Sequence, residues 1–250
     1  MNPTLYLHVG KHKTGTTSIQ KYIFENAAFF SDNGYWVVND SVCAMPEFIH
    51  ENILPANCFV LAHILLRANL MTPMRIRGHA PRMNLKEQSD IATRINSVLK
   101  EQAQSHNKNA LIISAEAFAF LRAPEERFLF DLMFKDFNVK PILFLREPNV
   151  WLKSWEKQVE PLSRLYQTHN PEDVKDTIFD FSGDSWLVDD VALQNFFLPD
   201  TCVLSYEVVC SQWGSVIPAF LNELGLNLTK CPDWNSFWEN RTVDKILIKS

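Results

Sequence analysis

The stretch LYLHVGKHKTGTTSIQKYIFENAAFF, residues 5–30, joins an apolar segment to an amphipathic one through a short glycine-containing loop. Residues 4–9 are apolar and are followed by Gly10, which is typical of a buried parallel strand. Apolar side chains then recur at helical spacing from about Thr17 to Phe30. A strand, a loop and a helix in this order predict an anion site at the start of the helix.

The loop at residues 10–17 has the spacing of a Walker A loop, but its lysine is displaced. Two glycines are separated by four residues and Thr17 supplies a hydroxyl, whereas Thr16 stands where the lysine is expected. The backbone amides of residues 15–18 and the helix dipole still favour an anion. The ammonium group is that of Lys13, inside the loop, where it can neutralise charge on a bridging oxygen as a bond breaks.

Strands and helices alternate along the rest of the chain. Strands are predicted at residues 35–38, 109–114, 139–146 and 201–207, and helices at 17–30, 56–70, 86–104, 124–137, 148–158 and 216–226. This alternation predicts a single α/β domain over residues 1–250, with a mostly parallel sheet flanked by helices. Residues 40–85 and 161–195 break the pattern with prolines and irregular polar residues, and we expect them to be substrate-side insertions.

The composition indicates an acidic globular protein. The net charge of -5 argues against a protein whose whole surface binds nucleic acid. Five scattered cysteines without paired spacing predict reduced thiols, without a disulfide framework or a zinc site. Because no secretory leader and no uncharged apolar run of about 20 residues is recognisable, we expect a cytoplasmic protein without a membrane span.

A second polar motif lies in PILFLREPNVWLKSWEKQ, residues 141–158. A predicted strand places Arg146 at its C-terminal end, where ligands bind in open α/β sheets, and Ser154 follows eight residues later on the next helix. A guanidinium fork and a hydroxyl can together hold phosphate oxygens. The alternative is that Arg146 pairs with Glu147 or another surface carboxylate and that Ser154 is an exposed helix residue.

The two motifs together resemble those of the sulfotransferases that use 3′-phosphoadenosine 5′-phosphosulfate (PAPS). Five consecutive residues are similar to the 5′-phosphosulfate loop of that family, namely Lys13, Thr14, Gly15, Thr16 and Thr17. Arg146 and Ser154 match the family's 3′-phosphate motif. The resemblance implies the P-loop-related sulfotransferase fold, PAPS as co-substrate, adenosine 3′,5′-bisphosphate as product, and no metal. It also implies that the loop, together with Ser18, holds the 5′ end of the nucleotide.

A third, shorter motif is ENRT at residues 239–242. It resembles a turn that helps to close the nucleotide site in bacterial members of the family. The resemblance makes Asn240 and Arg241 further candidate ligands of the nucleotide.

Sulfuryl transfer to a hydroxyl or an amine requires a base across from Lys13. Glu116 follows the predicted strand at residues 109–114, at the sheet edge that carries the loop, and apolar neighbours favour a raised pKa for its carboxyl. The segment SAE, residues 114–116, is similar to the Ser-x-Glu of bacterial sulfotransferases. Glu116 is alternatively a structural acid at a helix N-terminus or a substrate contact.

Histidine is the alternative base, because other members of the family use one. His63 and His79 lie in the first insertion and are the candidates for that role. His8 and His12 are interpreted as packing or loop residues.

The sequence therefore predicts an enzyme that transfers the sulfuryl group of PAPS to a small-molecule, lipid-linked or carbohydrate acceptor. A P-loop kinase or NTPase is one alternative, and the threonine at position 16 argues against it. A sulfotransferase-like protein that binds PAPS without turnover is the other. The identity of the acceptor and the oligomeric state are left open.

Overall fold

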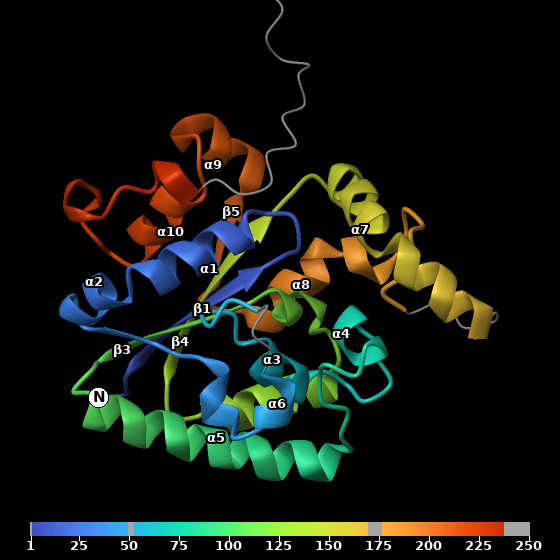
Figure 1. The fold of residues 1–250 in the computed structure, drawn as a ribbon, viewed down its shortest axis with the longest axis horizontal. Helices are drawn as coiled ribbons and strands as arrows, with labels where there is room; N and C mark the ends of the chain where they lie inside the picture. Colours follow the sequence, from blue (N-terminus) through green and yellow to red (C-terminus); the bar gives the residue numbers. More distant parts are fainter. Residues whose placement is uncertain (1, 50–52, 170–176, 238–250) are drawn as a thin grey trace, which may run out of the picture.

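The computed structural model describes residues 2–49, 53–169 and 177–237 (Figure 1). Its centre is a five-stranded sheet with the strand order β2-β3-β1-β4-β5, and every pair of neighbouring strands is parallel. The strands are β1 (Thr4–Gly10), β2 (Tyr35–Val37), β3 (Ala110–Ala115), β4 (Asn138–Leu145) and β5 (Cys202–Ser205). β1 is the central strand: β2 and β3, which come next along the chain, lie on one side of it, and β4 and β5 lie on the other. A crevice is expected where the strand order reverses, at the carboxyl end of β1.

Helices cover both faces of this sheet (Figure 1). One face carries α1 (Thr16–Glu25), α2 (Ala27–Asp32), α9 (Tyr206–Trp213) and α10 (Ile217–Glu223), and the other carries α3 (Phe59–Leu65), α5 (Leu85–Ser105) and α6 (Pro124–Phe134). Three more helices lie on the side to which the strand arrows point, namely α4 (Pro73–Ile76), α7 (Pro148–His169) and α8 (Asp190–Phe197). These bounds confirm the predicted α/β fold with a parallel sheet between helices.

The alternation of side chains along β1 explains why both faces are covered. Leu5, Leu7 and Val9 are fully buried in the hydrophobic cluster shared with α3, α5 and α6. Tyr6 packs against the cluster on the opposite face, which contains Ile19 and other side chains of α1 and α10. Successive residues of a strand point to opposite faces, so a strand that is apolar throughout requires a helix layer on each side.

Several element boundaries differ from the predicted ones. The predicted helix at 17–30 is interrupted at Asn26, whose side-chain amide donates to the carbonyl of Tyr22 at 2.9 Å and so ends α1. The predicted strand at 201–207 ends at Ser205, because the hydroxyl of Ser205 caps a helix, α9, that the sequence analysis did not predict.

The region 161–195 is more regular than predicted. Helix α7 continues through Pro161 to His169, and α8 follows within the same region. Proline removes one backbone hydrogen bond from a helix, but it does not stop helix formation where side chains beyond it pack. Tyr166, five residues beyond the proline, lies with its ring centroid 5.3 Å from that of Phe179.

The region 40–85 is held together by buried polar side chains. The carboxylate of Asp40 accepts the backbone amides of Val60 and Leu61, both at 2.9 Å, at the start of α3. Burial raises the pKa of Asp40 to about 7, although these hydrogen bonds act in the opposite direction. Arg75 is buried and donates to five carbonyl oxygens at 2.7–3.0 Å, those of His63, Leu66, Arg67, Leu70 and Pro81. One guanidinium therefore fixes the path of the chain around it.

Across residues 2–49, 53–169 and 177–237, no helix combines the length and the apolar character that crossing a membrane requires. The five cysteines are free, and Cys43 and Cys58 are buried.

Candidate active site

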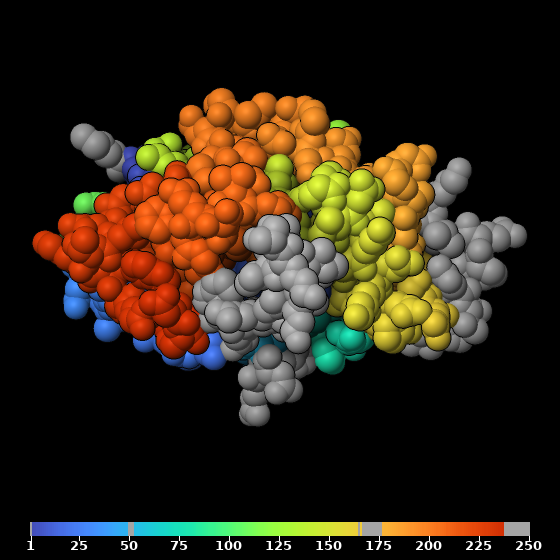
Figure 2. Space-filling view, turned by 90° about the horizontal axis from the view of Figure 1, so that it is seen from above, coloured from blue at the N-terminus to red at the C-terminus, as the bar shows by residue number. Residues whose placement is uncertain are grey.

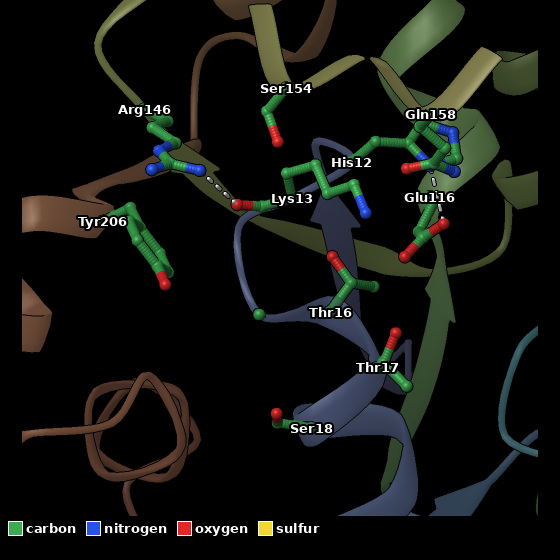
Figure 3. A pocket seen from close by; sticks show the side chains of 11 residues that line it. His12, Lys13, Thr16, Thr17, Ser18, Glu116, Arg146, Ser154, Gln158 and Tyr206 are labelled. Carbon is green, nitrogen blue, oxygen red and sulfur yellow. Dashed lines mark hydrogen bonds and ion pairs between the residues drawn. The ribbon is translucent and has the colours of Figure 1, made fainter. Parts of the chain in front are cut away.

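A polar cavity of about 290 Å³ lies at the carboxyl ends of the central strands (Figure 3). Seen from above the strand ends, α7 in yellow lies on one side of this edge and α9 and α10 in orange and red lie on the other (Figure 2). The lining residues come from the β1–α1 loop, the end of β3, the end of β4, α7 and α9, namely His12, Lys13, Gly15, Thr16, Thr17, Ser18, Glu116, Arg146, Ser154, Gln158 and Tyr206. The crevice thus brings both predicted nucleotide motifs and the candidate base to one space.

The loop between β1 and α1 has an unusual backbone. Lys13 and Gly15 both have left-handed conformations, with φ of 66° and 78°. A Cβ atom on Gly15 would lie 2.7 Å from a methyl of Val216, so both the backbone angle and the space require glycine. A lysine with a positive φ is uncommon and is held only where the surroundings enforce it, which is typical of a binding loop.

The loop leaves polar groups free at the start of α1. The first backbone hydrogen bond of the turn runs from the amide of Ser18 to the carbonyl of Gly15 at 3.0 Å. The amides of Thr16 and Thr17 therefore have no carbonyl partner within the described part of the chain. The hydroxyl of Thr16 is also buried without a hydrogen-bond partner among these residues. Buried orphan donors at a helix N-terminus are the groups that an anion would satisfy.

Two other predicted loop ligands are placed differently. Thr14 is fully buried, and its hydroxyl donates to the carbonyl of Lys11 at 2.5 Å instead of lining the cavity. The amide of Ser18 donates to the carbonyl of Gly15 within the turn, while Ser18 itself lines the cavity. Thr14 therefore shapes the loop.

The two lysines of the loop have opposite surroundings. The Lys11 side chain is 2% exposed, pairs with Asp190 of α8 at 2.5 Å, and lies 4.2 Å from the ring centroid of Trp151. Burial lowers the pKa of Lys11, while the charge and hydrogen bond of Asp190 act against this shift. Lys13 instead lines the cavity, and its side chain extends toward Thr16 and Glu116 (Figure 3). Lys13 is thus the loop cation available to a ligand.

Arg146 lies across the cavity from the start of α1. Its Nη1 is 3.4 Å from the carbonyl oxygen of Lys13, and its guanidinium carbon is 5.3 Å from the ring centroid of Tyr206. Nε forms an ion pair with Glu207 at 3.6 Å, so Arg146 does have a surface carboxylate as a partner. The distance exceeds that of a hydrogen bond, and Nε is buried without a hydrogen-bond partner among the described residues. The arginine therefore keeps donor capacity for a phosphate.

The other features around Arg146 agree with this reading. Glu147, the surface partner considered for Arg146, accepts the amides of Asn149 and Val150 at the start of α7 instead. Ser154 lines the cavity from α7 and points toward the loop (Figure 3). Burial raises the pKa of the cavity-lining Tyr206 to about 12, so its hydroxyl stays protonated at neutral pH.

Glu116 follows the last residue of β3 and is in contact with His12 of the loop. The distance from His12 Nδ1 to Glu116 Oε2 is 2.7 Å, and the two side chains are 15% and 23% exposed. Burial favours a higher pKa for Glu116, but the charge and hydrogen bond of His12, with a further contribution from Lys13, hold the pKa below its ordinary value. The prediction that apolar neighbours raise this pKa is therefore wrong, because it overlooked His12.

The surroundings of His12 fix its orientation. Its ring centroid lies 4.5 Å from that of Trp155 and 5.5 Å from that of Phe120, and its carbonyl accepts the indole N–H of Trp151 at 2.6 Å. The sequence predicts a packing or loop role for His12, and the structure adds a direct contact with Glu116. Sequence spacing carries no sign of this contact, because the two residues lie on different strand ends.

His8, His63 and His79 do not line the polar cavity. His63 has both ring nitrogens engaged, by the carbonyl of Phe59 and the hydroxyl of Thr72, and burial lowers its pKa to about 3. His8 is buried against Ser114, as its interpretation as a packing residue requires, and burial lowers its pKa to about 3. His79 is not among the residues that line this cavity.

Two residues that the sequence analysis did not propose also line the cavity. Gln158 lies four residues after Ser154 on α7, a spacing that places both on one helix face and was available from the sequence. Tyr206 begins α9 beside Arg146.

Asn240 and Arg241 lie outside the described residues. The described residues also contain no group of three or more His, Cys, Asp and Glu side chains arranged to hold a metal ion.

The arrangement of strands and helices is similar to that of two solved structures. One is the sulfotransferase domain from the curacin biosynthetic pathway, with 10% sequence identity and a TM-score of 0.51. The superposition covers 96% of this chain and 79% of that domain. The chain has the sulfotransferase fold. The sulfotransferase from Alicyclobacillus acidocaldarius covers 97% of this chain over 87% of its own, with 12% identity and a TM-score of 0.50. No protein-family model matches the sequence, and no curated protein is significantly similar to it.

Proposed function

We propose that this protein is a sulfotransferase that transfers the sulfuryl group of PAPS to a hydroxyl or an amine. The observation that carries the proposal is one cavity lined at one end by Lys13 and the start of α1, at the other by Arg146 and Ser154, and beside Lys13 by Glu116. An anion nest, a separate guanidinium and a carboxylate are the three elements that binding and transfer from PAPS require. The sulfotransferase fold supports the same reading.

In this proposal the free amides of Thr16 and Thr17 and the orphan hydroxyl of Thr16 bind the 5′-phosphosulfate. Arg146, whose Nε has no hydrogen-bond partner in the described chain, binds the 3′-phosphate together with Ser154. Tyr206, beneath the guanidinium, offers an aromatic face to the nucleotide from α9. These groups lie on rigid elements or on a loop that Thr14 closes, so little reorganisation accompanies binding.

The proposed transfer is a single in-line displacement. The acceptor oxygen or nitrogen forms a bond to sulfur while the bond between sulfur and the bridging phosphate oxygen breaks. The acceptor proton passes to Glu116, which its contact with His12 keeps ionised and oriented. The electron pair of the broken bond stays on the phosphate of adenosine 3′,5′-bisphosphate, where the ammonium of Lys13 offsets the new charge.

Thermal unfolding with three ligands tests the nucleotide assignment. We expect adenosine 3′,5′-bisphosphate at 100 times its dissociation constant to raise the midpoint by roughly 5 to 10 °C, because such binding stabilises a chain of this size by about 2.7 kcal/mol. 5′-AMP at the same concentration lacks the 3′-phosphate and should raise it much less. A shift produced only by ATP with magnesium would contradict the proposal in favour of a kinase or NTPase.

A turnover assay separates the enzyme from a protein that only binds PAPS. Sulfuryl transfer from radiolabelled PAPS to a panel of phenols, alcohols, amines and sugars should label at least one acceptor. Strong stabilisation by the bisphosphate, with no labelled product and no release of bisphosphate from PAPS across the panel, would contradict catalysis.

A further inference from the structure

A second pocket of about 190 Å³ adjoins the polar cavity at Glu116. The two share three lining residues, His12, Glu116 and Gln158. Glu116 therefore lies where the two spaces meet, and a group in the second pocket can approach it together with His12.

The walls of this pocket are mostly apolar. They are formed by Ile53, Phe59, Pro73, Met74, Ala117 and Phe120, which come from the region 40–85 and from the turn after β3. His63 and Thr72 also line the pocket, but their side chains hydrogen-bond to each other at 2.8 Å. A cavity of about 150 Å³ with apolar walls holds a benzene ring, so the volume here is that of one ring with a short substituent.

Arg77 is the exposed cation of this pocket. Arg77 is the residue that directly follows α4. Its side chain has no ion pair or hydrogen bond with any residue that the structure describes. Arg75, two residues earlier, differs because its guanidinium donates hydrogen bonds to five carbonyl oxygens. Arg75 is therefore committed to the backbone and does not line the pocket, whereas Arg77 lines it and is available to a ligand.

The charged side chains that line the pocket would orient an anionic acceptor in it. Among the described lining residues Glu116 is the only acidic side chain, and it lies where the pocket meets the polar cavity. An acceptor with a negative group would be repelled from Glu116 and attracted to Arg77, so its anionic end and its hydroxyl would point in opposite directions. The apolar residues that line the same pocket match a ring or a short hydrocarbon body.

We propose that the acceptor is a small hydroxy compound with a single ring-sized apolar body and an anionic substituent, such as a phenolic carboxylate. The inference rests on the proposed sulfotransferase function and adds the chemical class of the acceptor. The hydroxyl oxygen attacks sulfur, its proton passes to Glu116, and the carboxylate stays at Arg77 unchanged. Arg77 is in this reading a specificity-determining residue that does not touch the reacting atoms.

Matched acceptors test the charge preference. We would measure sulfuryl transfer from PAPS to 4-hydroxybenzoate, 4-hydroxyphenylacetate and 3-(4-hydroxyphenyl)propanoate, each beside its neutral carboxamide, with tyramine as a cationic analogue. The series varies the distance between the hydroxyl and the anion. For at least one acid, kcat/KM should exceed that of its amide roughly three- to tenfold, as expected for one partly exposed charge pair, and tyramine should be the poorest substrate.

Substitution of Arg77 identifies the group responsible. Arg77→Gln should raise KM for the preferred acid by the same factor, leave its kcat within about twofold, and leave the amide unaffected. Lys86→Gln is the matched control, because Lys86 is 87% exposed on α5 and lies outside the pocket. The control should keep the preference for the acid.

Three outcomes would overturn the inference. These are equal rates for every acid and its amide, an Arg77→Gln effect that is the same for acids and amides, and better transfer to a bulky neutral steroid than to every single-ring acid. Stabilisation by adenosine 3′,5′-bisphosphate is measured in parallel. If the bisphosphate stabilises the protein, only the proposed acceptor class has failed. If it does not, the proposed sulfotransferase function fails as well.

Discussion

Nδ1 of His12 lies 2.7 Å from Oε2 of Glu116, although the two residues come from the carboxyl ends of different strands, β1 and β3. Residues 4–9 and 110–115 pair in parallel register up to Val9 and Ala115, so the chain segments that follow them emerge side by side. The contact is thus a direct product of strand register. It places the imidazole ring of His12 against the carboxylate proposed as the base.

His12→Gln tests this contact through pH dependence. Burial is the largest influence on the pKa of Glu116 and raises it, while His12 lowers it. Removing His12 should therefore raise the pKa of Glu116, and the acid limb of the kcat/KM profile should move to higher pH. His106→Gln, at an exposed histidine after α5, is the control. An acid limb that stays in place in His12→Gln would show that His12 does not set the protonation of the base.

Lys13→Ala should lower kcat by about 10² to 10³, as removal of one preorganised electrostatic donor typically does. The loss should appear in kcat more than in the affinity for adenosine 3′,5′-bisphosphate, because the ammonium acts on charge that develops during transfer. Lys153→Ala removes an exposed lysine of α7 outside the cavity and should leave turnover unchanged. A Lys13→Ala enzyme that retains most of its turnover argues against the assigned leaving-group role.

Arg146→Gln should weaken binding of adenosine 3′,5′-bisphosphate about tenfold or more, while binding of 5′-AMP changes little. The reason is that Arg146 is assigned to the 3′-phosphate, which only the bisphosphate carries. Isothermal titration with both nucleotides measures the difference. Arg164→Gln, on an exposed arginine of α7, serves as the control for loss of one positive charge. An equal loss for both nucleotides would place Arg146 at the 5′ end instead.

Gly15→Ala and Gly34→Ala form a matched pair, because both glycines have positive φ, 78° and 88°. A Cβ at Gly34 meets nothing within 4 Å, whereas a Cβ at Gly15 lies 2.7 Å from Val216. We expect Gly34→Ala to lower the free energy of unfolding by about 1 kcal/mol, the usual cost of the left-handed conformation, and Gly15→Ala to lower it further. Equal losses in urea unfolding would mean that the Val216 contact relaxes freely.

The buried pair of Lys11 and Asp190 predicts an asymmetric loss of stability. Asp190→Ala should lower the free energy of unfolding by about 3 kcal/mol, because it leaves the 2% exposed Lys11 unpaired. Lys11→Met should cost less, since Asp190 is 17% exposed and regains water. Burial lowers the pKa of Lys11, so the unpaired amine loses its proton as pH rises and the Asp190→Ala deficit should narrow from pH 7 toward pH 10. An equal loss for both variants contradicts this account.

The sequence was sufficient for the sheet and for most groups at its carboxyl edge. Local patterns identified the β1–α1 loop and the placement of Arg146 at the end of β4, because strand and helix periodicity are properties of short segments. The continuation of α7 through Pro161 was not predictable in this way, since packing outweighs a local helix breaker. The effect of His12 on Glu116 depends on two distant segments, so no local pattern contains it.

The five carbonyl contacts of Arg75 separate the support of the second pocket from its inner surface. Met74 and Arg77 line the second pocket, whereas the buried Arg75 does not line it. Substitutions at the two inner positions can therefore be combined in a library while Arg75 preserves the wall. For the proposed sulfotransferase, such a library would vary the acceptor pocket without a substitution at Lys13, Arg146 or Ser154 of the polar cavity.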